Sequence, residues 1–343
     1  MKKLLLVPFV LFFALPAQSQ DIHFSQFNES PLHLNPAYTG VFNGQYRVMM
    51  NYRNQWQSMG HPYQTMAAAF DMPLLTNRPA YMGAGLYLYR DKAGDSGMGI
   101  LQALLSASAI VPIDGNSTLS AGLQGGFSQR SANISTLQWE SQYQNGTYDP
   151  TLSPNENNLL TSFPYADFSG GVAYRYQSVA DNLQGRDMWK INFGAAYFHL
   201  NKPRQKFYSG NDSRLNSRLV GHANGHFDFP GTKWSLQPSA VYMQQGPANE
   251  ILLGTMIRYK LKNGTKTTSL LTESGVALGA HYRFGDAIIP QLYYDLGDIF
   301  IGLSYDVNTS TYSEASKAKG GFEITLRYAN LNSALFKNKR PIH

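Results

Sequence analysis

The segment QYRVMMNYRNQW (Gln45–Trp56) alternates two kinds of side chain along its whole length. Its even positions carry the largely apolar or aromatic side chains Tyr46, Val48, Met50 and Tyr52. Its odd positions include Arg47 and Arg53. Because successive side chains of a strand point to opposite faces, this period of two predicts a strand with one apolar and one polar face.

The same alternation returns along the chain in fourteen segments of about ten residues, the pattern of outer-membrane barrels. The segments are residues 45–56, 63–72, 80–90, 98–112, 117–130, 165–177, 188–200, 219–229, 234–245, 250–261, 274–284, 287–296, 300–308 and 320–328. We therefore expect an all-β protein, a transmembrane antiparallel up-and-down β-barrel of outer-membrane type with about 14 strands. A soluble sandwich alternates as well, but its strands are usually about five or six residues long.

The first residues predict export. Lys2 and Lys3 precede the apolar run Leu4–Leu15, and Ala17-Gln18-Ser19 offers small residues for a signal peptidase. This pattern predicts a signal peptide over residues 1–19 and a mature chain from Gln20. With a barrel to follow, the expected location is the outer membrane of a Gram-negative cell.

Composition limits the chemistry. The chain has no cysteine, which excludes disulfides and thiolate metal sites. Aromatic residues make up 13% and charged residues only 15%, against about 25% charged in soluble domains. The formal net charge of +6, part of it from the leader, is too mild and too scattered to predict nucleic-acid binding. No internal linker divides residues 45–328, so we expect one barrel domain.

The connections predict the orientation. An even number of strands places both the start of the first strand and the end of the last strand at the periplasmic side, with the longer loops outside. The long connections 133–164, 201–218 and 309–319 then face outward, while 113–116, 230–233 and 297–299 form short inner turns. A tail, residues 329–343, follows on the periplasmic side.

The polar faces of these strands carry charges that we expect in the lumen. They are Arg47, Arg53, Asp167, Arg175, Arg258, Arg283, Asp295 and Glu323, together with Lys190, Asp228, Asp306 and Arg327. One interpretation is a selective pore. The other is a network of internal ion pairs and hydrogen bonds, and fourteen strands lie between the filled barrels of about eight strands and the open ones of about 16 to 18.

Catalytic or metal chemistry finds little support. His222 and His226 would share one face of a strand but lie about 13 Å apart, too far to bind one metal directly. Glycine pairs such as Gly83 and Gly85 lie within strands, where they are expected to ease curvature. No nucleophile elbow, zinc motif or phosphate-binding loop occurs. We predict a protein that is not an enzyme and has no cofactor.

Residues 20–44 do not fit the wall pattern. Apolar and aromatic side chains alternate irregularly with Pro31, Pro36 and Gly40. We expect a periplasmic N-terminal segment that either plugs the barrel or docks a partner. The partner-binding candidates are His23, Phe24, Phe27, Leu34 and Tyr38.

Several ordered strings carry a family resemblance. Near the start they are DIHFSQF (21–27), LNPAYTG (34–40) and NYRNQW (51–56), and near the end DAIIP (286–290), SYDVN (304–308) and GGFEI (320–324). They resemble the PorP/SprF proteins of the Bacteroidetes type IX secretion system. The resemblance spans the mature chain, although residues 133–164 match no family signature.

The resemblance implies a non-catalytic outer-membrane component of that system. Such a protein would bind the periplasmic secretion subunits, the C-terminal domain of an exported adhesin, or both, in support of secretion or surface anchoring during gliding. No binding residue can be transferred from the family motifs. The alternative reading from the residues alone is a passive channel for small or hydrophobic solutes.

Overall fold

The structure, a computed structural model, describes residues 21–56, 62–76, 80–94, 96–133, 137–155, 161–178, 188–206, 213–262, 273–310 and 318–330. The expected signal peptide and most of the expected tail lie outside the described residues. Among the described residues, no helix has the length and apolar character needed to cross a membrane.

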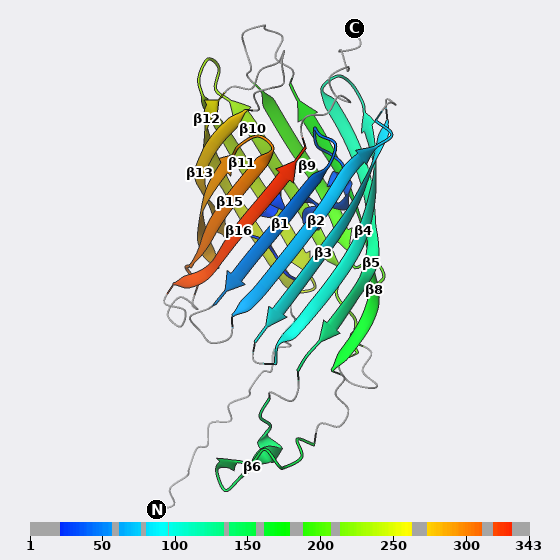
Figure 1. Cartoon of the computed structure of the whole chain (residues 1–343), viewed down its shortest axis with the longest axis vertical. Helices are drawn as coiled ribbons and strands as arrows, with labels where there is room; N and C mark the ends of the chain where they lie inside the picture. Colours follow the sequence, from blue (N-terminus) through cyan, green and yellow to red (C-terminus); the bar gives the residue numbers. More distant parts are fainter. Residues whose placement is uncertain are drawn as a thin grey trace, which may run out of the picture.

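Fourteen antiparallel strands form one closed barrel (Figure 1). They are β1 (Arg47–Gln55), β2 (Tyr63–Leu74), β3 (Tyr81–Ala93), β4 (Met98–Pro112), β5 (Ser117–Ser131), β8 (Ser162–Gln177), β9 (Trp189–Phe198), β10 (Arg218–Asp228), β11 (Trp234–Gln245), β12 (Ala248–Lys262), β13 (Ser274–Arg283), β14 (Ala287–Asp295), β15 (Ile299–Asn308) and β16 (Lys319–Ala329). Each strand pairs with its neighbours in the chain, and β1 pairs with β16 from Arg47↔Ala329 to Gln55↔Gly321. The predicted transmembrane barrel is confirmed, with strand ends shifted by a few residues.

The period of two gives the wall its two faces. On β4 and β5 the outward side chains Leu105, Leu123 and Phe127 are 69%, 70% and 72% exposed, whereas inward Gln102 and Gln124 are buried. Lipid would cover the apolar exterior. Closure leaves no free sheet edge, so the backbone of the wall can pair within the protein.

Aromatic side chains gather near the strand ends. Tyr46 lies against Tyr328, and Trp234 lies against Tyr259. At the opposite end Trp56 packs edge-on to Tyr63. Such belts mark the two membrane–water interfaces of outer-membrane barrels.

The two ends of the barrel differ in their connections. At the loop end, where β1 ends, the strands are joined by the long connections 132–161 and 199–217. The first of these carries a small hairpin of β6 (Tyr143–Gln144) and β7 (Thr147–Tyr148), which projects beyond the barrel (Figure 1). At the turn end, where β1 begins and β16 ends, short turns such as 113–116 and 229–233 join the strands.

Candidate functional site

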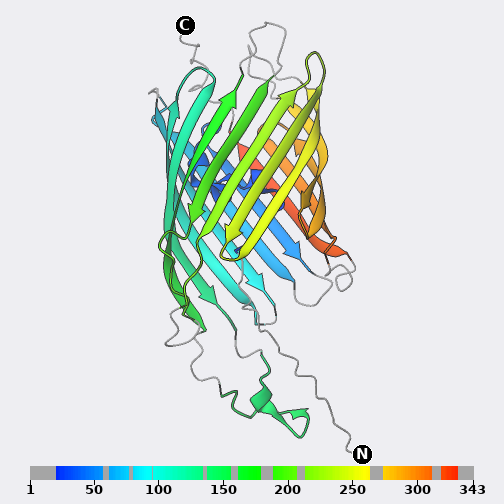
Figure 2. The same ribbon diagram turned by 180° about the vertical axis from the view of Figure 1, so that it is seen from behind.

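The first described residues, 21–44, lie inside the barrel, and we call them the plug. Asp21 contacts His199 just beyond the end of β9, at the loop end. At the other extreme, the Gln45 amide donates to the carbonyl of Asn330 at the turn end (2.9 Å). The plug therefore runs through the lumen from the loop half to the turn end, and both ribbon views show it inside the barrel (Figures 1 and 2). Of the two expected alternatives, a plug or a docking segment, these contacts are those of a plug, because the side chains find their partners within the barrel.

Prolines and glycine keep the plug in short turns. It contains η1 (Phe27–Glu29), α1 (Pro31–Leu34) and η2 (Pro36–Tyr38), and Pro31 and Pro36 each begin a helical turn. Proline fits the first helical position because that position needs no amide donor. The Asn35 side chain caps η2 by accepting from the Ala37 amide (2.9 Å).

Two apolar clusters hold the plug against the inner wall. Phe24 and Leu32 pack with the wall residues Met49 and Tyr87. Phe27 and Leu34 belong to a second cluster on the other side of the lumen, which includes Val220, Leu252 and Ile289. Burial of each such side chain is worth about 1.5–3 kcal/mol, so these contacts favour a fixed plug.

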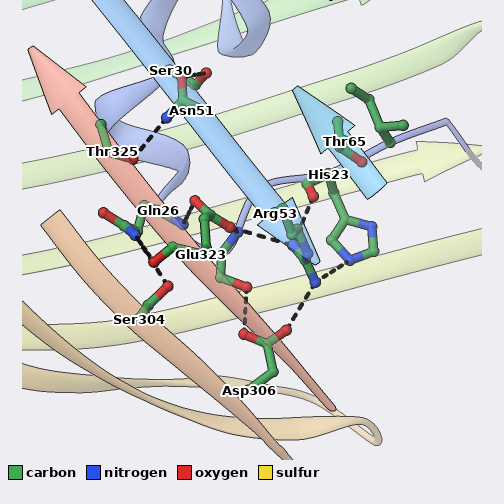
Figure 3. A network of polar contacts seen from close by, with 12 residues as sticks. His23, Gln26, Ser30, Asn51, Arg53, Thr65, Ser304, Asp306, Glu323 and Thr325 are labelled. Carbon is green, nitrogen blue, oxygen red and sulfur yellow. Dashed lines mark hydrogen bonds and ion pairs between the residues drawn. The ribbon is translucent and has the colours of Figure 1, made fainter. Parts of the chain in front are cut away.

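A buried polar network fixes the start of the plug in the loop half of the lumen (Figure 3). The backbone amides of Ser25 and Gln26 both donate to the Glu323 carboxylate, at 2.8 and 3.0 Å. The Arg53 guanidinium donates to the His23 carbonyl (2.7 Å) and to Asp306 (2.8 Å). The network thus joins the plug to strands β1, β15 and β16.

Arg283 extends this network to β13, two strands along the wall from β15. Its guanidinium donates to the Ser25 hydroxyl (2.8 Å) and to Asp306 (3.0 Å), while the Ser25 hydroxyl donates to Asp306 (2.7 Å). Glu250 lies 3.3 Å from His23 and 3.6 Å from Arg283. Arg53, Arg283 and Glu323 are each at most 3% exposed. Charges so deeply buried persist only when paired, and here they are.

The middle of the plug meets strands that have no side chain at the point of contact. The side-chain amide of Asn35 donates to the backbone carbonyls of Val172 (3.0 Å) and Ala195 (3.3 Å), and its nitrogen lies 3.0 Å from the His222 ring. A Cβ atom on Gly171 would overlap the Asn35 side chain. The inward glycine therefore makes room for the plug.

Asp21 and His199 form a buried latch at the loop end. Asp167 accepts from the other ring nitrogen of His199 (2.9 Å) and from Gln102 (3.0 Å). Burial lowers the pKa of His199, but the carboxylates of Asp21 and Asp167 outweigh burial and raise it to about 9. Burial alone would raise the pKa of Asp21, yet His199 holds it below its usual value. The imidazolium thus bridges plug and wall at neutral pH.

The turn half holds its own pairs. Arg47 makes two hydrogen bonds to Asp71 (2.7 and 2.9 Å), and Asp71 also accepts from the Gly40 amide of the plug (2.8 Å). Arg327 donates to Glu29 of the plug (2.6 Å). Arg258 lies near the turn end with Glu273 (2.6 Å) and Asp295 (3.8 Å).

A cavity of about 250 Å³ separates the plug from the wall in this half, and we call it the turn-end cavity. Its lining includes Arg47, Arg175, Lys190 and Arg327. Among the described residues, no ion pair joins Arg175 or Lys190 to a carboxylate, although Glu29 of the plug lines the same cavity and acts electrostatically on Lys190. Arg175 donates to the amide oxygen of Asn192 (3.1 Å). These two cations stand apart from the paired charges elsewhere in the lumen.

The five partner-binding candidates all lie inside the barrel. Phe24, Phe27 and Leu34 are 1%, 4% and 4% exposed. His23 contacts Arg53 and Glu250, and the Tyr38 hydroxyl lies 3.3 Å from His222. Wall and plug cover Phe24, Phe27 and Leu34, whereas His23 and Tyr38 are partly exposed. Partner binding by these five residues stays a prediction.

The wall glycines have a role that the sequence alone did not reveal. Gly83 was expected to ease curvature, but a Cβ there would overlap the Thr39 carbonyl, and a Cβ on Gly122 would overlap that of Pro36. The signal was present as glycine at inward positions on neighbouring strands. His222 and His226 do have separate partners, Asn35 and Asp228. No group of three possible metal ligands occurs among the described residues.

Comparisons place this barrel among known proteins. The family profile of the "Type IX secretion system membrane protein PorP/SprF" matches residues 17–328. The chain belongs to the PorP/SprF family. No curated protein matches the sequence.

Solved outer-membrane barrels resemble this PorP/SprF protein in fold. A Pseudomonas aeruginosa FadL homologue has a TM-score of 0.48 at 11% identity, covering 87% of this chain and 93% of its own. BamA from Haemophilus ducreyi lacking POTRA domains 1–3 has a TM-score of 0.42 at 10% identity, covering 83% of this chain and 70% of its own. The β domain of the Bordetella autotransporter BrkA has a TM-score of 0.41 at 11% identity, covering 84% of this chain and 100% of its own.

Proposed function

We propose that this protein is a non-catalytic outer-membrane component of the type IX secretion system that binds other proteins at its two ends. Its partners are the periplasmic subunits of the machinery, the C-terminal domain of a cognate exported adhesin, or both. It would support secretion or surface anchoring of that adhesin in a Gram-negative bacterium of the Bacteroidetes. Family membership supports the system, and the plugged lumen supports binding rather than conduction.

The observation that carries this proposal is the plug. Ser25, Leu32, Asn35 and Thr39 are fully buried in the centre of the barrel. A passive channel for small or hydrophobic solutes needs a continuous passage, and the plug stands in its place. What the barrel offers to partners is then its loops and turns.

The two ends suit different partners. By the rule that bacterial barrels carry longer loops outside, the loop end faces the cell surface and the turn end faces the periplasm. The hairpin of β6 and β7 presents Tyr143, which is 47% exposed and packs on Tyr148. Exposed tyrosines are frequent in protein interfaces. We assign the adhesin to the loop end and the machinery to the turn end.

Photo-crosslinking in native membranes tests both assignments. A crosslinking amino acid replaces Tyr143 at the loop end, Thr232 in a turn at the other end, or Leu105 on the lipid face as a control. We expect Tyr143 to capture an exported adhesin, Thr232 to capture a periplasmic type IX subunit and Leu105 to capture neither. If neither Tyr143 nor Thr232 forms a crosslink to an adhesin or to a periplasmic type IX subunit, the proposal is contradicted.

A further inference from the structure

The ladder between β10 and β11 is interrupted in the turn half of the barrel. Pairing runs to Asn224↔Ser239 and resumes at Phe227↔Leu236. Between these points, Gly225 and His226 are not paired in the ladder with Pro238 and Gln237, all of them described residues. Pro238 has no amide hydrogen to donate. A wall in lipid normally pairs its whole backbone, so this break is costly and calls for a reason.

Side chains cover the break on both faces. On the lumen side, the Gln237 amide lies 2.9 Å from the His226 ring, which also binds Asp228 (3.0 Å). On the outer side, a Cβ on Gly225 would overlap the Phe227 ring, so that ring lies over the glycine. The side chains of Gln237, His226 and Phe227 thus cover the gap where backbone hydrogen bonds do not.

Hollows lie on both sides of this break. Outside is an apolar groove of about 870 Å³, the outer groove, lined by side chains such as Ala223, Leu253 and Ile288. Inside is the turn-end cavity. Five residues line both hollows: Asn224, Gly225, Pro238, Ser239 and His281. The interrupted stretch is thus part of the wall that separates the apolar outer groove from the turn-end cavity, whose lining includes Arg175 and Lys190.

Two other places in the wall show that this combination is unusual. A second outer hollow lies over Gly122 and Gly171, but there the ladder is continuous and the plug fills the inner side. The ladder between β14 and β15 is also interrupted at Pro290, yet its inner side is occupied by the paired Asp306. The β10–β11 break has a cavity behind it.

The charges beside the break specify the ligand. Lys190 is directly opposite His226 across the β9–β10 ladder, and Arg175 is opposite Asn192, the neighbour of Asn224. Opposite residues of a sheet have Cβ atoms about 5 Å apart. Both cations therefore lie within one or two strands of the break, and among the described residues neither forms an ion pair with a carboxylate. Glu29, the acid that lines the same cavity, is paired with Arg327 (2.6 Å). An anion would complete this site.

We propose that the break is a lateral window that binds an acidic phospholipid, with one acyl chain in the outer groove and the phosphate at Arg175 and Lys190. The outer groove spans β9 to β14, about 24 Å at the usual strand spacing, which suits an extended chain. By the orientation assigned above, the window opens in the periplasmic half of the membrane. This site goes beyond the proposed partner binding and does not depend on it.

A switchable disulfide tests the window, because the chain has no cysteine of its own. The purified full chain carrying His226→Cys and Gln237→Cys is placed in zwitterionic detergent, and bound phosphatidylglycerol is measured by native mass spectrometry. Oxidation would link the two strands across the gap. We expect binding in the reduced form and at least about tenfold weaker binding in the oxidised form. Val220→Cys with Met243→Cys, a pair in the continuous ladder, is the matched control and should bind alike in both states.

Charge variants test the headgroup site independently. Arg175→Gln with Lys190→Gln should weaken phosphatidylglycerol binding about tenfold, as expected for loss of charged hydrogen bonds. Lys92→Gln, an exposed cation near the loop end, should leave binding unchanged. Heat-modifiable migration on gels verifies the folded barrel in each case. Equal binding of phosphatidylcholine, binding of oleate in place of phospholipid, or binding that neither oxidation nor the charge variants alter would overturn the proposal.

Discussion

Charged side chains have different partners in the two halves of the lumen. In the loop half, Arg53 and Arg283 each contact acidic groups and plug atoms within a few ångströms. In the turn half, Arg175 and Lys190 face a cavity and lack carboxylate partners among the described residues. The comparison teaches that charge in a barrel lumen has two uses. Paired charges fix the plug, and unpaired charges remain for a ligand.

The largest effect is expected in the loop half. Arg53→Gln leaves Asp306 and Glu323 buried with fewer cationic partners, and breaking such a pair costs about 3–5 kcal/mol. We expect a matching fall in the free energy of unfolding in detergent, measured with urea, and faster proteolysis of the plug. Arg90→Gln, an exposed arginine of β3, serves as the control. If Arg53→Gln leaves the free energy of unfolding and the rate of plug proteolysis unchanged, the distinction between the two halves is lost.

The His199 latch should make the plug sensitive to pH. Its folded pKa of about 9 lies above the ordinary value of 6.5, so the stabilisation is complete below pH 6.5 and is lost as pH rises through 9. The shift corresponds to at most about 3 kcal/mol. Hydrogen exchange of residues 21–24 should quicken across this interval. In His199→Asn it should be fast throughout, and a wild-type profile that is flat after correction for intrinsic exchange would contradict the latch.

The glycine contacts predict a smaller steric effect. Gly122→Val would push a side chain into the Pro36 carbonyl, and overpacking of this kind costs about 1–3 kcal/mol. We expect a lower melting temperature and a more accessible plug. Gly221→Val is the matched control, since a Cβ there meets nothing within 4 Å. Similar losses in both variants would mean that the glycines serve the wall alone.

The smallest effect is expected for Lys190. Lys190→Gln removes a cation that forms no ion pair within the described part of the chain and lies near Arg175, so the free energy of unfolding should change by no more than about 0.5 kcal/mol. Urea unfolding in the same detergent as for Arg53→Gln gives the direct comparison. A loss of several kcal/mol would show that Lys190 belongs to the paired, structural class.

The wall could be predicted from sequence because its rule is local. Alternation at Gln45–Trp56 is enough to place Arg47 and Arg53 on one face, whatever the rest of the chain does. The pairing of Arg53 with Asp306 could not be predicted, since the partners are 253 residues apart and their meeting depends on barrel closure. The same holds for the plug. Its residues have no period, and its position follows from contacts with almost every part of the wall.

The turn-end cavity shows a second limit of prediction from the sequence. Arg175 and Arg283 have the same character in the sequence, inward arginines on alternating strands. Only the arrangement of neighbours makes Arg283 a partner of Asp306, while Arg175 has the amide of Asn192 and no paired carboxylate among the described residues. The break at Pro238 was equally hidden, because proline is tolerated at irregular points of a sheet without revealing what lies behind it.

The central claim is that the plug closes the lumen, so that the barrel acts through its ends. Ion conductance of the purified full chain in a planar bilayer tests it most directly, beside a variant that lacks residues 21–43. We predict no steady conductance from the full chain and steady channels from the shortened one. Steady conductance of equal size from both would contradict the account.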